Sequence, residues 1–353
     1  MVTMANELGE DEVHVVPRES YRRRAFLYFM DSEDESEDLR WLQYGVTELL
    51  AQDLEQNPFL LVSSPWDGFF PEIEEAGFES GLGLPVSLKR SIADEANRDF
   101  FIDGVSDLRD GQFTLTVRVW KTASMELVGE STVSGWNLPG LVDELSDDVR
   151  EILDTPPGGD DLPLSETFGE SEDALKYYIA ARNAVLLDND RQEANRLYGL
   201  ALNEDPDFAM AWLMKSRSLW EQGDGAGALA ALEQAQKRTW RLSERNQANV
   251  KLMSYGIAGE NEKVGTLLRI GRRITGEASS FPPFATSLCF TAELDEAKIH
   301  FERQMELDSS AIGTLLQLAN IERSAGDMEA AIAYVEEYIS QRPEDFDSLM
   351  MLG

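Results

Sequence analysis

Hydrophobic and polar residues change their periodicity once along this chain, near residue 155. Before that point, short apolar runs with strand character alternate with segments whose apolar residues recur every three or four positions, the spacing of an amphipathic helix. After it, only the helical spacing recurs. The pattern predicts an α/β or α+β sandwich domain followed by an all-α region.

The first region has the predicted element order β-α-β-α-β-β-β-α. Its first strand is the aromatic run 25–30, and the longest helix follows at 39–56. Residues 112–119 alternate apolar and polar side chains, which is typical of a sheet with one covered face. Asp110-Gly111 just before them is a hairpin turn signal. The remaining predicted elements are strands at 59–62, 100–105 and 127–133 and helices at 87–97 and 141–153.

Three segments show neither periodicity. Residues 1–23 are charged and have little to bury, residues 65–85 are rich in proline, glycine and aromatic residues, and residues 155–163 hold prolines and glycines that break helix and strand alike. The predicted domains are a charged lead-in at 1–23, an α/β domain at 24–154, a Pro/Gly linker at 155–170 and a helical region at 171–353.

Three motifs of the first region resemble TolB N-terminal-like domains. Residues 41–50 (WLQYGVTELL) are similar to the helix "yfadGlteeL" of that family, residues 100–105 (FFIDGV) to its strand "yvleGsv", and residues 113–120 (FTLTVRVW) to its strand "rvtvqLvda". The resemblance spans residues 25–153. It implies the fold of the domain and carries over no catalytic residue.

A repeat runs through the second region. Small residues open successive second helices at a spacing of 33–36 residues, at Ala194, Ala228, Val264, Ala297 and Ala331. A helix–turn–helix unit of about 34 residues is the tetratricopeptide (TPR) repeat. We therefore predict a superhelical TPR solenoid with repeats at 175–208, 209–242, 245–278, 278–311 and 312–345. Tyr178 and Trp212 occupy the large aromatic position of their first helices, where burial is expected.

Two departures from the repeat are visible. Gly271 replaces the usual small Ala in the third repeat, and Pro282-Pro283 falls within the expected first helix of the fourth and should shorten it. Leu352-Gly353 matches the beginning of a sixth first helix. A solenoid end without a polar cap exposes an apolar face, so we expect this chain to be a fragment of a longer protein.

Composition narrows the function. The chain has 66 acidic and 31 basic residues and a net charge of −35, which disfavours binding to nucleic acid. One cysteine and two histidines exclude a disulfide framework and multi-Cys or multi-His metal sites, and no apolar run reaches the ~18 residues of a membrane span. The acidic run 31–38 lacks the turn glycine of a calcium loop and is interpreted as a solvated loop. No nucleotide-binding motif is present, so we expect no cofactor and no enzyme.

The strongest functional prediction is a peptide- or partner-binding groove on the concave wall of the solenoid, which is formed mainly by the first helices of the repeats. By register, the residues lining it are Asn183, Leu213, Arg217, Trp220, Asn249, Met253, Asn320 and Arg323. Apolar anchors combined with amide and guanidinium donors suit an extended peptide or a helix. The alternative for each residue is packing between repeats. Ile179 and Leu213 stand where a carboxylate clamp needs Lys, so such a clamp is not expected.

The resemblance also implies a biological setting. In similar proteins this domain pair often follows a Ser/Thr kinase, an adenylate or other nucleotide cyclase, or a winged-helix regulator, commonly after a membrane span. It implies the sensing or partner-binding region of a bacterial signalling protein, extracytoplasmic if a span precedes it. The alternatives are a self-contained cytoplasmic TPR scaffold or adaptor and a carboxylate-based hydrolase, which would need two acids held across a cleft. Partner identity and oligomeric state stay open.

Overall fold

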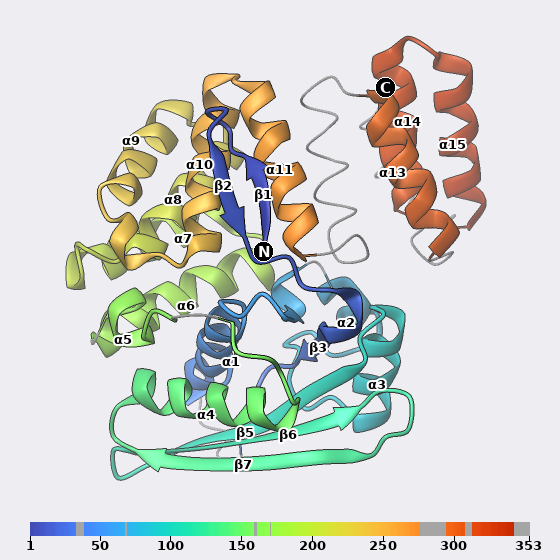
Figure 1. Ribbon diagram of the computed structural model, residues 1–353. Coiled ribbons are helices and arrows are strands. Elements are labelled where there is room, and N and C mark those ends of the chain that lie inside the picture. The colour runs from blue at the N-terminus through green and yellow to red at the C-terminus, as the bar shows by residue number, and fades with distance from the viewer. Residues whose placement is uncertain are drawn as a thin grey trace. The chain divides into compact units, whose positions relative to one another are not determined.

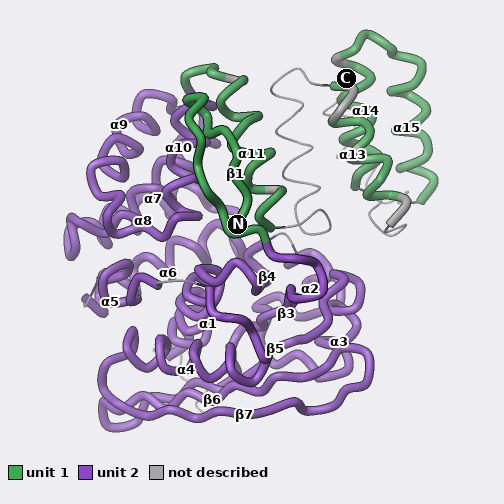
Figure 2. The backbone as a smooth tube through the Cα atoms, in the orientation of Figure 1, with its two compact units in different colours: residues 1–16, 258–353 green, residues 17–257 purple. Residues whose placement is uncertain are grey.

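The computed structural model describes residues 1–32, 39–67, 69–158, 161–169, 171–275, 294–307 and 313–341 (Figure 1). The chain divides into two compact units, one of residues 17–257 and one of residues 1–16 with 258–353 (Figure 2). The order is an N-terminal α/β region followed by a helix-rich region, as the change of periodicity predicts.

A five-stranded sheet forms one layer of the larger unit, with strand order β4-β3-β5-β6-β7. β3 is parallel to β4 and β5, whereas β5, β6 and β7 are antiparallel neighbours. Asp110 and Gly111 join β5 to β6 with φ of 54° and 80°, the positive values that a tight hairpin turn requires, so this turn is confirmed. The strands are β3 (Arg23–Leu27), β4 (Leu60–Ser63), β5 (Phe100–Arg109), β6 (Gln112–Lys121) and β7 (Leu127–Gly135).

The two faces of the sheet are covered to different extents. Helices α1 (Arg40–Leu54) and α4 (Leu138–Ile152) pack on one face, where alternate residues of β3 and β6 are buried. α2 (Phe70–Glu75) and α3 (Val86–Glu95) contribute to a second, smaller core on the other face, with Phe26, Tyr28 and Phe101. The outer part of that second face, formed by β6 and β7, carries exposed threonine and serine hydroxyls. The strict alternation in β6 thus marks one covered face, as predicted.

A layer of helices follows in the same unit (Figure 1). α6 packs against α7, α7 against α8, and α8 against α9. Ser171, Asp190 and Asp224 cap α6, α7 and α9 by accepting a backbone N–H three residues on, the usual role of such side chains. The elements are α5 (Leu164–Thr167), α6 (Glu172–Leu186), α7 (Arg191–Glu204), α8 (Ala209–Glu221), α9 (Gly225–Gln236) and α10 (Glu244–Ala258), with 3-10 turns at Glu19–Tyr21, Pro65–Asp67 and Thr239–Arg241.

Helix α1 lies between the sheet and the helical layer, and eleven of its fifteen residues are buried. Residues of both layers belong to one hydrophobic core, among them Leu50 of α1, Val142 of α4 and Tyr178 of α6. The segment between the layers is tied to the end of α1, because Gln56 and Asn57 hydrogen-bond to Leu162 and Pro156. The domain boundaries drawn at 155–170 stay a prediction, but a shared core extends across them.

The aromatic residues expected at equivalent repeat positions differ in burial. Tyr178 is fully buried, whereas Trp212 is only half-buried. The indole Nε1 of Trp212 donates to the carbonyl oxygen of Pro206 at 2.9 Å, and Lys215 and Arg238 lie over its ring, each 5.9 Å from the centroid. The expectation that Trp212 is buried was wrong. Tyr178 lies in the core that includes α1, and Trp212 lies at the margin of that core.

The smaller unit contains a two-stranded antiparallel sheet and several helices. Ala297, Phe301, Leu318 and Ile321 form a small core there. Its elements are β1 (Val2–Ala5), β2 (Asp11–His14), α11 (Asn261–Thr275), α13 (Leu294–Leu307), α14 (Thr314–Ala325) and α15 (Met328–Gln341).

Two segments hold more structure than the sequence predicts. Residues 1–23, interpreted as a charged lead-in, include the β1–β2 hairpin, whose strands of four residues each are too short to stand out as a pattern. Residues 65–85, predicted to be irregular, include α2. The acidic run beyond Ser32, Pro282-Pro283 and the expected sixth helix at 349–353 lie outside the described residues.

Candidate functional site

The eight predicted groove residues have different environments. Those of the larger unit range from the buried Leu213, which is 2% exposed, to the exposed Arg217, Trp220 and Asn249. Asn320 and Arg323 belong to α14 of the smaller unit, where Arg323 Nη2 donates to Asn320 Oδ1 at 3.0 Å. Arg217, Trp220, Asn249 and Arg323 are exposed, Asn183, Met253 and Asn320 are half-buried, and Leu213 is buried.

Within the larger unit, burial decreases along the predicted wall of α6 and α8, whereas in α10 the exposed Asn249 precedes the half-buried Met253. In α8, Leu213 is buried in the core, whereas Arg217 and Trp220, one and two turns later, are exposed. In α6, Ile179 is fully buried and Asn183 is half-buried, with its Oδ1 atom in a buried position without a hydrogen-bond partner. Leu213 therefore packs between helices and offers no surface to a ligand, and only the later positions are open.

Helix α1 carries a polar stripe that faces α6 and α10. Glu48, Gln52 and Glu55 follow one another at i, i+4 and i+7, so they share one face of the helix. Glu48 is buried, and its Oε1 atom accepts hydrogen bonds from the Tyr178 hydroxyl at 2.9 Å and from Arg182 Nη1 at 2.8 Å. This group joins α1 to α6.

The guanidinium of Arg182 has a second contact. It lies 4.6 Å from the ring centroid of Trp66, within the range of a cation–π interaction. Burial raises the pKa of Tyr178 well above its usual value, and the neighbouring Glu48 carboxylate acts in the same direction. Tyr178 therefore remains a hydrogen-bond donor over the whole physiological pH range.

The other two residues of the stripe join α1 to α10. Asn246 Nδ2 donates to Gln52 Oε1 at 2.8 Å, and Arg245 Nη1 lies 2.7 Å from Glu55 Oε1. Burial raises the pKa of Glu55 to about 7, although Arg245 acts in the opposite direction. One polar stripe of α1 thus holds both α6 and α10 against the sheet layer.

The same end of α1 holds a further buried acid. Asp53 pairs with Arg150 of α4 at 2.9 Å, and burial raises the pKa of Asp53 to about 6, although the nearby Ser146 hydroxyl and Arg150 act in the opposite direction. Arg150 also contacts Asp161 at 2.7 Å. This network continues the polar junction toward the segment between the layers.

A separate charged cluster lies on the opposite face of the sheet. Asp103 of β5 is fully buried and accepts hydrogen bonds from Lys89 at 3.2 Å, Arg118 at 3.1 Å and Trp120 at 3.0 Å. Lys89 also pairs with Asp31 at 3.1 Å. Because its donors converge on one carboxylate from α3 and β6, this cluster fixes α3 and β6 against β5.

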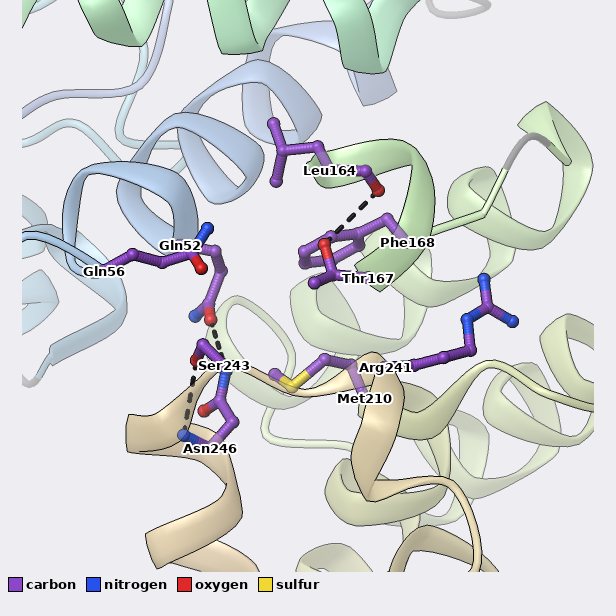
Figure 3. A pocket seen from close by; sticks show the side chains of 9 residues that line it. All are labelled: Gln52, Gln56, Leu164, Thr167, Phe168, Met210, Arg241, Ser243 and Asn246. Carbon is purple, nitrogen blue, oxygen red and sulfur yellow. Dashed lines mark hydrogen bonds between the residues drawn. The ribbon is translucent and has the colours of Figure 1, made fainter. Parts of the chain in front are cut away.

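Two cavities of the described chain are small or shallow. One, between α1, α5, α8 and the beginning of α10, has a volume of about 10 Å³, which is room for about one water molecule (Figure 3). Another is an open depression of about 310 Å³ beside Arg98, whose guanidinium donates to Ser63 Oγ at 2.6 Å. The side chains lining the first are Gln52, Gln56, Leu164, Thr167, Phe168, Met210, Arg241, Ser243 and Asn246.

Among the residues that the structure describes, no group of three His, Cys, Asp or Glu side chains is placed to hold a metal ion. None of the helices described combines the length and apolarity needed to cross a bilayer.

Known proteins give no direct indication of what this site does. No protein-family model matches the chain, and no curated protein matches it either. Sequence analysis identified the exposed residues of α8 and α10 but missed the stripe Glu48, Gln52 and Glu55. Their helical spacing is visible in the sequence, but a solvent-exposed helix face has the same pattern, so the pattern does not predict that α6 and α10 cover them.

Proposed function

We propose that this chain is a non-enzymatic protein- or peptide-interaction module, built from a TolB-N-like α/β domain and TPR-type helix pairs. Helix pairs at a spacing of about 34 residues and the five-stranded sheet with its helices support this proposal. The setting that the resemblance implies is the sensing or partner-binding region of a bacterial signalling protein.

The observation that carries the proposal is the exposed side of the second half of helix α8. Arg217 and Trp220 are one turn apart on α8, and both are exposed, although the preceding turn is buried. Arg217 lies 3.0 Å from Glu221, which also pairs with Arg191, so an acidic ligand group would compete with Glu221 for these guanidinium groups. Exposed tryptophan next to arginine is the composition of interface hot spots.

The binding surface in this proposal is smaller than the sequence predicts. It comprises Arg217, Trp220 and Asn249. Short peptides with an apolar anchor and one carboxylate fit this surface better than long acidic ones, because the chain carries a net charge of −35.

A displayed library of random peptides, selected on the full chain, tests this proposal. Selected peptides should bind the Arg217→Ala/Trp220→Ala variant at least about tenfold more weakly, as expected when a hot spot is lost. The matched control is Lys237→Ala/Trp240→Ala, which removes an exposed cation and an exposed tryptophan elsewhere in the same unit and should leave binding unchanged. Equal loss in both variants, or in neither, contradicts the proposed surface.

A self-contained TPR scaffold or adaptor would use the same surface, so the two versions differ only in what else the full gene encodes. The hydrolase alternative has less support. The buried acids Glu48, Asp53 and Asp103 are each paired with an arginine in the interior. A glycosidase-type pair would instead need two carboxyl groups facing an open cleft.

A further inference from the structure

Strand β7 is an edge of the five-stranded sheet. Within the described part of the chain, β6 is the strand that pairs with it, which leaves its outer edge of nine residues unpaired. Exposed edges are normally protected by lysine, proline or shortness. β7 has no lysine and no proline, and its single charged residue is Glu130.

The strand is held firmly from one side. Val133 is buried, and Gly129 and Gly135 lie so close to α4 that a Cβ atom at Gly129 would be 2.9 Å from Cγ2 of Ile152. The other face is polar, with hydroxyl pairs Thr116–Thr132 at 2.9 Å and Thr114–Ser134 at 3.1 Å. The backbone of β7 is therefore fixed in an extended conformation, ready to accept another strand.

Apolar side chains are exposed at both ends of this strand. Leu127 and Val128 are 44% and 37% exposed at its beginning, and Trp136 is 75% exposed just after its end. The regular pairing with β6 runs from Gly129 to Gly135, and its centre is Thr132. Val128 and Trp136 lie at equal distances on either side of Thr132.

We propose that β7 binds β7 of a second copy of this chain, antiparallel and with a two-fold axis at Thr132, to form one continuous sheet. A two-fold axis places each residue opposite the one equally far on the other side of the centre. Val128 then faces the partner's Trp136, and this apolar pair occurs twice. In the same contact, the exposed backbone N–H and C=O groups of the two edge strands form hydrogen bonds with each other.

A second copy can occupy this edge despite the charge of the chain. Two chains of net charge −35 repel each other over most of their surfaces, so a homotypic contact requires a segment poor in acids. In the proposed register Glu130 faces the partner's Ser134, a hydroxyl donor, and never the partner's Glu130. A two-fold contact requires that Val128 and Trp136 lie equally far from its centre. Binding of a single peptide has no such requirement.

The first test is the mass of the full chain in solution, measured by sedimentation equilibrium over a range of concentrations in about 0.5 M NaCl, where charge repulsion is screened. We expect the mass to rise from one chain to two. The variants Val128→Lys/Trp136→Lys and Val128→Glu/Trp136→Glu should each weaken dimerisation at least tenfold, and an equal mixture of the two should restore it. Leu229→Lys/Trp240→Lys, equally exposed in the helical layer, should dimerise normally.

A chain that stays monomeric at every concentration overturns the proposal, and so does a dimer that survives both charged variants. Peptide binding at this edge by a monomeric chain would likewise show that the occupant is another molecule. Circular dichroism melts of each variant check that these exposed substitutions leave the fold intact.

The register has its own test in a Cys289→Ser background. Thr132→Cys should form an intermolecular disulfide on oxidation, since directly opposed residues of antiparallel strands lie within disulfide reach. Ser134→Cys should not, because the two sulfurs would be about 13 Å apart along the strands. Crosslinking at 134 but not at 132 would overturn the two-fold axis at Thr132.

Discussion

The two sides of helix α1 are covered in different ways, one by apolar packing and the other by hydrogen bonds and ion pairs. Toward the sheet, α1 presents Leu42, Val46 and Leu49, which belong to the apolar core. Toward α6 and α10 it presents Glu48, Gln52 and Glu55, each held by a specific partner. Apolar packing tolerates many residues of similar volume, whereas a buried charge tolerates only its partner. We therefore expect the apolar side to supply stability and the polar side to select which helices pack there.

The largest effect should follow removal of the cation on the polar side. Arg182→Met leaves Glu48 buried without its charged partner, which should cost about 3–5 kcal/mol of unfolding free energy. The double variant Glu48→Leu/Arg182→Met removes both charges and should recover most of that loss. Urea unfolding measures all three chains. A cost below about 1 kcal/mol for the single variant would mean that water reaches the pair.

On the apolar side no second substitution should rescue the first. Leu49 is fully buried, and Leu49→Ala should cost about 2–5 kcal/mol through lost burial and an empty cavity. The same urea experiment compares it with the Arg182 series. If Glu48→Leu also restored this variant, the two sides of α1 would not be independent.

The next effect compares the two aromatic positions of the helical layer. Tyr178→Ala should destabilise by about 3–5 kcal/mol, the range for emptying a fully buried aromatic site, whereas Trp212→Ala at the half-buried equivalent should cost roughly 1–3 kcal/mol. Thermal melts give the ranking. Equal losses would contradict the different burial of the two side chains.

A smaller effect depends on pH. Because burial raises the pKa of Glu55 to about 7, above its unfolded value, the native state binds more protons between pH 4 and pH 7. Stability from this group is greatest at low pH and falls as pH rises through about 7. The unfolding free energy should therefore decrease less between about pH 5 and pH 8 in Glu55→Gln than in the unmodified chain, by roughly 1–3 kcal/mol. Glu151→Gln, exposed on α4, is the control and should leave the slope unchanged.

The smallest expected effect is that of salt. With a net charge of −35, surface repulsion opposes folding, so the melting temperature should be higher at about 1 M than at about 0.05 M NaCl. The buried Glu48–Arg182 pair is screened much less. The cost of Arg182→Met should consequently be nearly the same at both salt concentrations, and a cost that disappears in high salt would place the pair in water.

Much of the fold was predictable from residue patterns. Alternation in β6, the aromatic run 25–30 that begins within β3 and the Asp110-Gly111 turn each correspond to the observed sheet, since local geometry alone sets those signals. The spacing of small residues likewise placed the pairs α6–α7 and α8–α9 within a few residues. The exposed pair Arg217 and Trp220 was also identified from register.

Other features depended on which segments pack together. Glu48, Gln52 and Glu55 have the composition of a solvated helix face, and nothing local reveals that α6 and α10 cover them. Trp212 and Tyr178 occupy equivalent positions, yet only Tyr178 is fully buried, in the core that α1 helps to form. Periodicity records which side of an element avoids water, because that preference is a property of each side chain. The partner of a polar side is set by the assembled layers, because burying a charge requires a matching donor from a distant segment.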